Sequence, residues 1–327
     1  MLLNLAFLGF GNVNRAFAEL LMEKKDFLEE MGFDINIVAV LTSKGGIVQR
    51  FIDPEELVAA SHPSVLDGFA SDVSVDDLTD SRVDVALFAI PPNYSTGEPN
   101  LSLMKTLIER GIAVITADKT PLAHAFTDVM DFARSSGTFI GIRATVMAGT
   151  PAIDLVRGLK GREVKRISAV LNGTTNYLLS LLERGSSFDE ALNKLVEIGL
   201  AEPDPSVDVD GLDSAAKLTI LLNLLGEEVT ISSVERISLR EVDEEEVRKA
   251  RTLGRRYKYL AVADLEKGVF QVKPEVLKEN DPLATVEENY NALKLEVEDD
   301  VIVLTGPAGP PPVTARAMFT DLLEFVG

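Results

Sequence analysis

Five short runs of consecutive, largely apolar residues set tight limits on the fold of the first half of the chain. They are residues 4–8, 35–41, 83–90, 112–116 and 138–142. Between them, apolar residues recur three and four positions apart, as from residue 13 to about residue 31, where Gly32 ends the pattern. Because the runs are continuous rather than alternating, they fit strands buried on both faces, as in a parallel sheet covered by helices. We therefore predict an α/β fold with a doubly wound, mainly parallel Rossmann-type sheet.

After about residue 145 this regular alternation lapses. Strand patterns occupy residues 164–171, 257–265, 269–277, 291–298 and 301–306, and helical patterns occupy residues 174–184, 188–199, 212–225 and 314–325. Ser187 and Glu190 have the spacing of a capping box at the start of the second of these helices. These patterns predict an α/β domain at residues 1–143, an inserted α+β domain at 144–305, and a C-terminal helix at 306–327 that returns to the first domain.

Composition excludes several classes of function. The net charge of −20 argues against binding to nucleic acid or to anionic membranes, because both require basic patches. The chain contains no cysteine, which excludes a disulfide framework, a thiolate nucleophile and a thiolate metal site. No uninterrupted apolar stretch is long enough to span a membrane, and the N-terminus lacks the features of a signal peptide. We expect a soluble, cytoplasmic protein.

A glycine motif follows the first apolar run. Gly9 and Gly11 lie between a predicted strand and a predicted helix, where the pyrophosphate of a dinucleotide meets a helix N-terminus. Asn14 replaces the third glycine of the full motif, so a simple tight turn stays open as an alternative, although dinucleotide binding is favoured. No acidic residue ends the second strand; Ser43 and Lys44 follow it instead. This pattern favours a 2′-phosphate, and hence NADP in binding, with NAD possible and with Arg50 as a less favoured helper of Lys44.

A cluster of carboxylates precedes a single lysine in the second half. Glu202, Asp204, Asp208, Asp210 and Asp213 all stand before Lys217. Asp213 and Lys217 are four residues apart and share one face of a predicted helix, where an exposed pair contributes roughly 0.3–0.5 kcal/mol. The spacing of a calcium-binding EF-hand loop is absent. A metal loop, a plain acidic turn and a pocket for an ammonium group remain open on the residues alone.

Several longer motifs identify a family. The stretches LNGTTNYLL (171–179) and GLAEPDPSVDVDGLDSAAKL (199–218) are the most specific, and PPNYSTGEP (91–99), ITADKTPLA (115–123), ATVMAGTPAI (144–153) and LTGPAGPPPVTARAMFTDLL (304–323) follow the same order. The sequence resembles homoserine dehydrogenase over almost its whole length. The resemblance implies NAD(P)-dependent interconversion of L-aspartate 4-semialdehyde and L-homoserine, in threonine, methionine and isoleucine biosynthesis. It also implies that residues 1–143 form a dinucleotide-binding domain and residues 144–305 a substrate-binding, catalytic and dimerisation domain. The expected protein is a homodimer, in a short form without a C-terminal regulatory domain.

The resemblance also implies roles for individual residues. Lys217 matches the proton donor and acceptor on the substrate oxygen, and Lys119 matches a second lysine between nicotinamide and substrate. Glu202 and Asp213 match ligands of the substrate's ammonium and hydroxyl groups, and Asp208 is expected to orient the lysine. The other implied residues are Asn172, Thr174 and Thr175 in the substrate pocket, Phe10, Gly11, Asn12 and Val13 at the pyrophosphate, Ile90, Pro91 and Ala117 beside the adenosine and nicotinamide, and Gly306 beside the nicotinamide.

The chain departs from the family pattern at a few positions. Asp118 stands where relatives have Asn, and the glycine-rich segment after Gly306 is shortened. Arg143 stands where relatives have a Glu that binds a monovalent cation together with carbonyls matching Val146, Ala148 and Thr150. Because a guanidinium only donates hydrogen bonds, we expect no metal at this position. We expect it instead to hydrogen-bond the neighbouring carbonyls.

Two other functions share part of this pattern. An aspartate-semialdehyde dehydrogenase of similar build needs a cysteine nucleophile, which this chain lacks. A non-enzymatic cofactor-binding sensor would not need the two lysines and the acidic set, which are intact.

Overall fold

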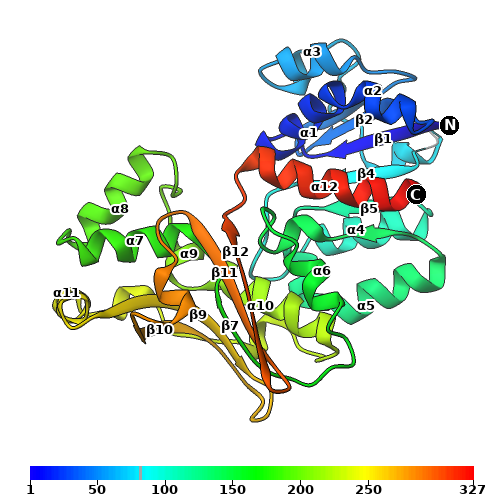
Figure 1. Cartoon of the computed structure of the whole chain (residues 1–327). Coiled ribbons are helices and arrows are strands. Elements are labelled where there is room, and N and C mark those ends of the chain that lie inside the picture. The colour runs from blue at the N-terminus through cyan, green and yellow to red at the C-terminus, as the bar shows by residue number, and fades with distance from the viewer. Residues whose placement is uncertain (81–82) are drawn as a thin grey trace. The chain divides into compact units, whose positions relative to one another are not determined.

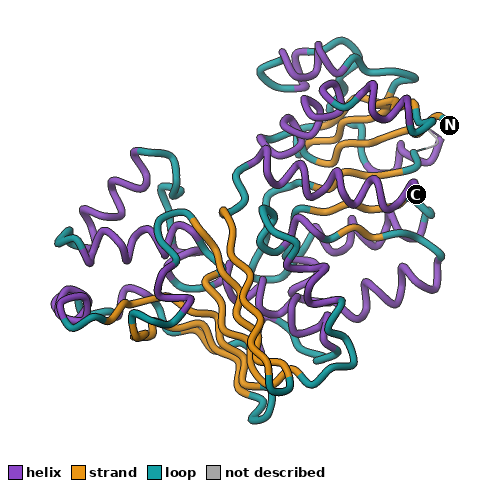
Figure 2. The backbone as a smooth tube through the Cα atoms, viewed as in Figure 1, coloured by secondary structure: helices purple, strands orange, loops and turns teal. Residues whose placement is uncertain are grey.

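The structure, a computed structural model, describes residues 1–80 and 83–327. The chain forms two compact units. One consists of Met1–Ala148 together with Gly309–Gly327, and the other of Gly149–Ala308. Each unit contains a six-stranded sheet, drawn in orange in Figure 2.

The first unit is built on a mainly parallel sheet with the strand order β3-β2-β1-β4-β5-β6. All neighbouring strands are parallel except β3, which runs antiparallel to β2. The strands are β1 (Leu2–Leu8), β2 (Asp34–Thr42), β3 (Gly45–Val48), β4 (Val85–Phe88), β5 (Ala113–Thr116) and β6 (Ile140–Gly141). The predicted doubly wound α/β fold is therefore confirmed, and the strand order reverses between β1 and β4, where such folds bind ligands.

Helices accompany this sheet, including two, at residues 54–59 and 120–136, for which the sequence patterns predict no helix. They are α1 (Asn12–Glu23), α2 (Lys25–Glu30), α3 (Pro54–Ala59), α4 (Asn100–Glu109), α5 (Thr120–Ser136) and α12 (Pro311–Val326), labelled in Figure 1. The expectation of one continuous helix from residue 13 to residue 31 is wrong, because the backbone leaves helical geometry at Lys24 (φ −97°, ψ 9°). Neither glycine nor proline stands at this break, so the pattern of residue types contains no signal for it.

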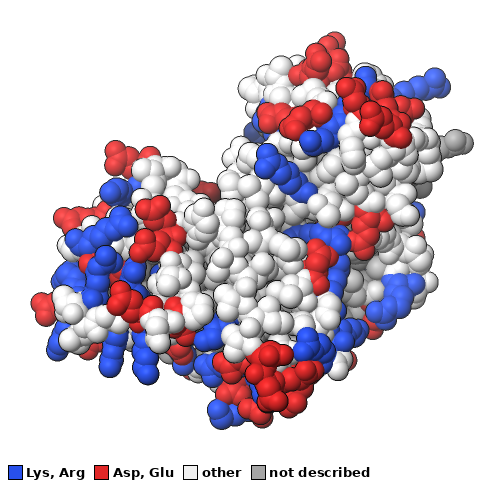
Figure 3. Space-filling view, viewed as in Figure 1, with Lys and Arg blue, Asp and Glu red and all other residues white. Residues whose placement is uncertain are grey.

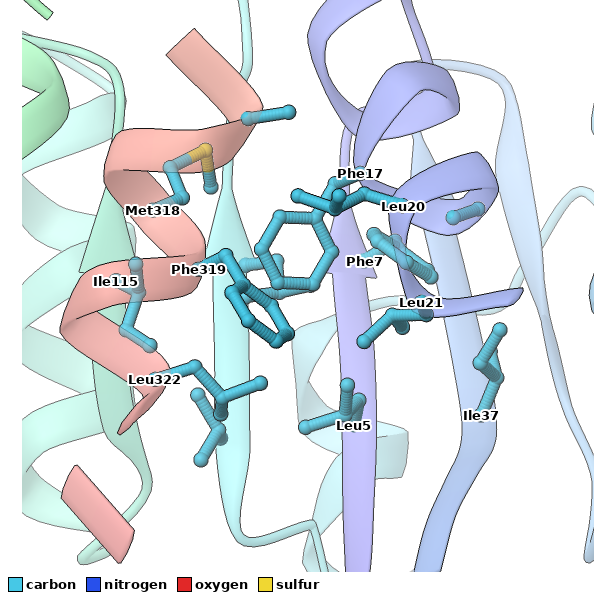
Figure 4. Packing of buried hydrophobic residues seen from close by; sticks show 14 of the residues in the cluster. Leu5, Phe7, Phe17, Leu20, Leu21, Ile37, Ile115, Met318, Phe319 and Leu322 are labelled. Carbon is cyan, nitrogen blue, oxygen red and sulfur yellow. The ribbon is translucent and has the colours of Figure 1, made fainter. Parts of the chain in front are cut away.

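The core of the first unit joins the two ends of the chain. Phe17 of α1 lies between Phe7 of β1 and Phe319 of α12, with ring centroids 6.2 and 6.4 Å away. Leu5, Ile115 and Leu322 complete this part of the core, and all are buried (Figure 4). At about 25 cal/mol per Å² of buried apolar area, side chains of this size contribute roughly 1.5–3 kcal/mol each. α12 is thus an integral part of the first unit although it ends the chain.

The second unit contains a mixed sheet with the order β12-β11-β7-β9-β10-β8. Its long strands pair antiparallel, and only the short β8 runs parallel to its neighbour β10. The strands are β7 (Val164–Val170), β8 (Glu235–Arg236), β9 (Arg255–Asp264), β10 (Val269–Lys278), β11 (Tyr290–Val297) and β12 (Asp300–Pro307). All but β8 correspond to strand patterns in the sequence.

The second unit also contains helices, and one of them carries Lys217. They are α6 (Ala152–Arg157), α7 (Gly173–Glu183), α8 (Phe188–Glu197), α9 (Ser206–Val209), α10 (Leu212–Leu225) and α11 (Glu244–Thr252). α10 matches the predicted helix at both ends, because Gly211 and Gly226 flank it with φ angles of 78° and 104°, which favour glycine. The capping box of Ser187 and Glu190 is present at the start of α8.

Lys258 of β9 is a buried lysine, with 1% of its surface exposed. Its Nζ donates to Oδ1 of Asn176 at 2.9 Å and to the carbonyl of Val286. Burial, reinforced by the nearby Arg256 guanidinium, lowers the pKa of Lys258 to about 8. In the unfolded chain the same group has its ordinary pKa near 10.5.

This pKa difference predicts a pH-dependent stability. Between about pH 8 and 10.5 the unfolded chain binds the proton of Lys258 and the folded chain does not, so the folded state gains stability as pH rises. Below pH 8 the cost of burying the ammonium is fully present, at roughly 3 kcal/mol. Relative to Lys258→Met, the wild type should therefore become more stable as pH is raised from 7.5 towards 10. Chemical unfolding of both proteins across this range measures the difference, and parallel pH profiles would contradict it.

Two further observations concern the charged surface and the length of the helices. On the face in Figure 3, Lys and Arg side chains lie interspersed with Asp and Glu. Among residues 1–80 and 83–327, no helix is both long and apolar enough to cross a membrane.

Candidate active site

The turn between β1 and α1 has the geometry of a phosphate-binding turn. Gly9 has a φ of 78°, and a Cβ there would lie 2.4 Å from the carbonyl oxygen of Ala89, so only glycine fits. Gly11 precedes α1 without a capping side chain, and a Cβ there would meet no atom within 4 Å. The first N–H groups of α1 are therefore accessible at Asn12 and Val13, beside the buried Phe10. Such an N-terminus favours an anion.

Asn14, which replaces the third glycine, is completely buried at this turn. Its Nδ2 donates to the carbonyls of Leu8, Gly9 and Leu87, at 3.2, 2.7 and 3.0 Å. These bonds tie the start of α1 to the ends of β1 and β4. The incomplete glycine motif is thus compensated by a side chain that holds the turn closed.

Ser43 and Lys44 form the exposed tip of the β2–β3 hairpin. The Oγ1 of Thr42 accepts the N–H of Lys44 at 3.2 Å and donates to the carbonyl of Gly45 at 2.9 Å, which fixes this turn. Because the tip follows the carboxyl end of β2, it occupies the place where doubly wound folds bind the adenosine ribose.

The suggestion that Arg50 assists Lys44 is wrong. Arg50 follows β3, which runs back along β2, and its carbonyl accepts from Nδ2 of Asn36 at 2.9 Å near the start of β2. With Ala39 opposite Val48 in this pairing, Arg50 lies towards the amino end of β2, away from the hairpin tip. Sequence proximity suggested the role, and the antiparallel return of β3 excludes it.

The segments after β4 and β5 end at the same edge of the sheet. Ile90 and Pro91 follow β4, and Ala117 and Lys119 follow β5, so the implied cofactor residues of the first unit gather at the carboxyl ends of β1, β2, β4 and β5. The ammonium of Lys119 lies 3.5 Å from the hydroxyl of Tyr94 and 5.9 Å from its ring centroid. Tyr94 has no role in the sequence prediction, although it lies in one of the quoted motifs.

Asp118, next to Lys119, is a buried carboxylate with a full set of donors. It accepts from Nδ2 of Asn100 at 2.6 Å and from the N–H and hydroxyl of Thr120 at 2.9 Å each. Asn100 also donates to the carbonyl of Pro91 at 2.9 Å. Asp118 therefore joins the segment after β4 to the start of α5, immediately beside Lys119.

In the second unit, four predicted site residues form one hydrogen-bonded cluster. Nδ2 of Asn172 donates to Asp208 at 2.7 Å and to Asp213 at 2.9 Å. The Nζ of Lys217 donates to the same Oδ2 of Asp213 at 2.7 Å and to the carbonyl of Leu171 at 2.6 Å. The Asp213 and Lys217 side chains are only 9% and 15% exposed, so they do not form the weak surface pair that their spacing alone suggests. Two of the three ammonium N–H groups have partners among the described residues, which leaves one for a ligand.

Local structure brings this cluster together. Asn172 caps α7, because its Oδ1 accepts the N–H of Thr175 at 2.9 Å, and this leaves its amide N–H groups for the two carboxylates. The hydroxyl of Thr174 donates to the carbonyl of Leu200 at 3.1 Å, which fastens α7 to the loop that carries Glu202. Glu202 itself is exposed and has no described contact with the cluster.

The two remaining acids of the stretch have local partners. Asp204 accepts the N–H of Ser206 at 3.1 Å, and hydrogen bonds from Ser206 lower the pKa of Asp204. Asp210 accepts the hydroxyl of Ser238 at 2.6 Å. Neither acid has a described hydrogen bond to the cluster of Asn172, Asp208, Asp213 and Lys217.

Gly306 and Leu171 complete the second unit's candidate residues. Gly306 lies within β12, and a Cβ there would be 2.0 Å from the side chain of Thr150, so close packing requires glycine. The carbonyl of Leu171, which accepts from Lys217, has no role in the sequence prediction, because a backbone acceptor cannot be read from residue types.

Arg143 opens a short 3₁₀ turn in the first unit. Its Nη1 donates to Oδ1 of Asp321 at 2.7 Å and also to Glu324, and its N–H donates to Oδ2 of Asp321 at 2.9 Å. Asp321 is fully buried. These carboxylate partners in α12 lie 178 and 181 positions away, so no local pattern predicts them. Within the described parts of the chain, no group of three or more His, Cys, Asp or Glu side chains is arranged to hold a metal ion.

Comparisons with known proteins give a consistent result. Residues 151–323 match the family model described as homoserine dehydrogenase. The homoserine dehydrogenase of Sulfurisphaera tokodaii is 37% identical over 98% of this chain and 98% of its own length. The NAD(+)-dependent homoserine dehydrogenase of Pseudomonas canavaninivorans is 30% identical over 98% of this chain and 95% of its own length.

Solved structures agree with these relatives. A putative homoserine dehydrogenase from Archaeoglobus fulgidus superposes with a TM-score of 0.88 at 27% identity, covering 99% of both chains. A hyperthermophilic archaeal homoserine dehydrogenase in complex with NADPH superposes with a TM-score of 0.85 at 29% identity, covering 99% of this chain and 97% of the other.

Proposed function

The chain belongs to the homoserine dehydrogenase family, and from this premise we propose how its residues divide the chemistry. The protein is an NAD(P)-dependent oxidoreductase that interconverts L-aspartate 4-semialdehyde and L-homoserine in the biosynthesis of aspartate-family amino acids. Absorbance at 340 nm with homoserine, run with NAD and NADP in parallel, measures this activity. A sensor that only binds the cofactor would give no change in absorbance.

We propose that Lys217 is the acid–base group on the substrate oxygen. The observation that carries this role is its buried position beside Asp213 and the Leu171 carbonyl, with one ammonium N–H left for a ligand. When bound, the reduced nicotinamide supplies a hydride to the aldehyde carbon. Lys217 delivers a proton to the carbonyl oxygen as negative charge develops there, and in the reverse direction its amine accepts the hydroxyl proton.

The neighbouring residues are proposed to hold the substrate for this transfer. Asp213 and Glu202 would bind its ammonium and hydroxyl groups, and Asp208 would orient the lysine through the shared Asn172 amide. Thr174 and Thr175 support the pocket by fixing the first turn of α7. Lys119 is proposed to serve the nicotinamide side from the first unit.

The cofactor is proposed to bind along the carboxyl edge of the first unit's sheet. The residues fit a dinucleotide, because Gly9 permits close approach of the backbone and the N-terminus of α1 is uncapped by any side chain. The pyrophosphate would lie at Phe10, Gly11, Asn12 and Val13, and Ser43 and Lys44 would face the ribose. Ile90, Pro91 and Ala117 would border the adenosine and nicotinamide, and Gly306 would pack beside the nicotinamide. A relative that binds NADPH and another named as NAD-dependent leave both cofactors in use within the family.

Lys44→Ala should separate the two cofactors. We propose that NADP(H) binds more tightly than NAD(H), because the hairpin tip offers a hydroxyl and a cation to a 2′-phosphate and no acid to a ribose. The substitution should weaken NADP(H) binding roughly tenfold or more and leave NAD(H) binding nearly unchanged. Titration calorimetry of both cofactors measures the two dissociation constants. Arg50→Ala, at the other end of the hairpin, is the control and should change neither, and equal losses for both cofactors in Lys44→Ala would exclude the role.

A homodimer is proposed through β12, the edge strand of the second sheet. Val301 and Val303 of this strand are 57% and 38% exposed, and no other described strand pairs with its outer edge. An apolar edge of this length favours pairing with another chain. Light scattering should give twice the chain mass of 35.5 kDa. Val301→Lys should yield monomers, whereas Val276→Lys on β10 should not; a monomeric wild type would contradict the proposal.

A further inference from the structure

The loop at residues 286–290, hereafter the 286–290 loop, packs against the first residue of α7. A Cβ at Gly173 would lie 2.0 Å from Oδ1 of Asn289, so glycine is needed for this approach. Gly173 directly follows Asn172, whose amide binds both Asp208 and Asp213. The 286–290 loop therefore supports the end of α7 that carries the substrate cluster.

Lys258 of β9 links this loop to α7 through hydrogen bonds. Its buried Nζ donates to the Val286 carbonyl in the loop and to Oδ1 of Asn176 in α7, the latter at 2.9 Å. Nδ2 of Asn176 in turn donates to the carbonyls of Val286 and Glu288, at 3.3 and 2.8 Å. One ammonium and one amide thus join loop and helix, one helical turn after Asn172.

The charged side chains nearest Lys258 pair with one another rather than with its ammonium. Arg256 binds Glu183 of α7 through Nε, at 2.9 and 2.8 Å, and Glu287 of the loop through Nη1 and Nη2, at 3.2 Å each. The hydrogen bonds of Lys258 go to a carbonyl and an amide rather than to a carboxylate. A buried ammonium is costly without such bonds, and here the bonds fix the loop carbonyl of Val286 relative to the α7 amide of Asn176.

The far end of the loop contacts a second implied site segment. The carbonyl of Asn289 accepts the N–H of Ala308 at 3.0 Å, just after β12 and two residues from Gly306. The position of Asn289 therefore affects both the start of α7 and the end of β12.

We propose that Lys258 is a positioning residue for the substrate: by anchoring the 286–290 loop against α7 it sets Asn172, and through it Asp213 and Lys217, in the geometry that binds homoserine. The inference rests on the proposed function, because it takes Asn172, Asp213 and Lys217 as the substrate site. Lys258 itself does not touch the reacting atoms.

Lys258→Met tests this role, because methionine retains much of the side-chain volume and removes the donors. kcat/KM for homoserine should fall roughly 10- to 100-fold, the effect of a small misplacement of binding groups. The dissociation constant for NADP(H) should stay within about twofold of wild type, because that cofactor's proposed contacts lie mainly in the first unit. Lys273→Met on β10 is the control, since Lys273 pairs with Glu275 on its own strand. A lower melting temperature with kcat and KM equal to those of the control would show a merely structural role and overturn the proposal.

Asn289→Ala gives an independent test at the other end of the contact and keeps the proposal falsifiable if Lys258→Met fails to fold. It should also raise KM for homoserine several-fold and change NADP(H) binding much less, because alanine keeps the backbone carbonyl that accepts from Ala308. Hydrogen exchange should be faster at residues 287–290 and in the first turn of α7 in Lys258→Met. If the wild type does not oxidise homoserine, the proposed function fails, and if Lys217→Ala keeps the wild-type kcat, the proposed role of Lys217 fails. If Lys217→Ala is impaired but Asn289→Ala equals wild type in KM and kcat, only this inference fails.

Discussion

Lys217→Ala should lower kcat for homoserine oxidation roughly 10²- to 10⁴-fold, the usual contribution of a positioned proton-transfer group. The dissociation constant for the cofactor should stay close to that of wild type, because Lys217 lies in the second unit and bonds only to Asp213 and Leu171 among the described residues. Steady-state kinetics together with cofactor titration separate these two effects.

The matched comparison is Lys119→Ala, which removes the other lysine implied at the site. Lys119 is expected to affect the nicotinamide side, so its loss should change cofactor binding as well as turnover. Should Lys217→Ala retain most of its kcat while Lys119→Ala loses it, the roles of the two lysines must be exchanged.

Asp213→Asn tests the proposed substrate contact of the carboxylate. It retains an acceptor for Lys217 while removing the charge that holds the substrate, so KM should rise more than kcat falls.

Arg143→Met should destabilise the first unit by roughly 3–5 kcal/mol, because it leaves the fully buried carboxylate of Asp321 without its cation. Since Asp321 lies in α12, the substitution should also speed hydrogen exchange in that helix. Thermal unfolding and exchange of the α12 amides measure both effects. Glu324→Gln, which removes the 46% exposed partner, should cost less than about 1 kcal/mol.

A double substitution sharpens this test. Arg143→Met with Asp321→Asn removes both charges, so it should recover part of the stability that Arg143→Met loses.

Arg143 also predicts how activity responds to monovalent cations. Its guanidinium forms ion pairs with Asp321 and Glu324 and cannot coordinate a metal. Activity measured at constant ionic strength should therefore not depend on sodium or potassium. Strict dependence on either ion, or equal stability of Arg143→Met and wild type, would contradict this account.

Much of the architecture was predictable from local patterns. Continuous apolar runs indicated the buried parallel strands, and the capping box of Ser187 and Glu190 located the start of α8. Gly211 and Gly226 bounded α10 correctly at both ends, which placed Asp213 and Lys217 on one helical face. These features are set by backbone preferences and side-chain period within a few residues, so sequence alone determines them.

Contacts between distant segments were decided by the tertiary structure. Asn14 compensates for a missing glycine through the Leu87 carbonyl, 73 positions away, and Arg143 finds Asp321 178 positions away. The role of Arg50 failed for the same reason, because the return of β3 moves it away from Lys44.

The candidate site shows the same division. Spacing put Asp213 beside Lys217, and motif resemblance named Asn172 and Asp208. Only the fold showed that one amide binds both carboxylates across 36 and 41 residues, and that the helical pair is buried rather than solvated. Burial and long-range donors depend on which segments pack together, and packing is a property of the whole unit rather than of any local pattern. The sequence therefore determined the residues and their helix, and the tertiary structure decided their partners and their exposure to water.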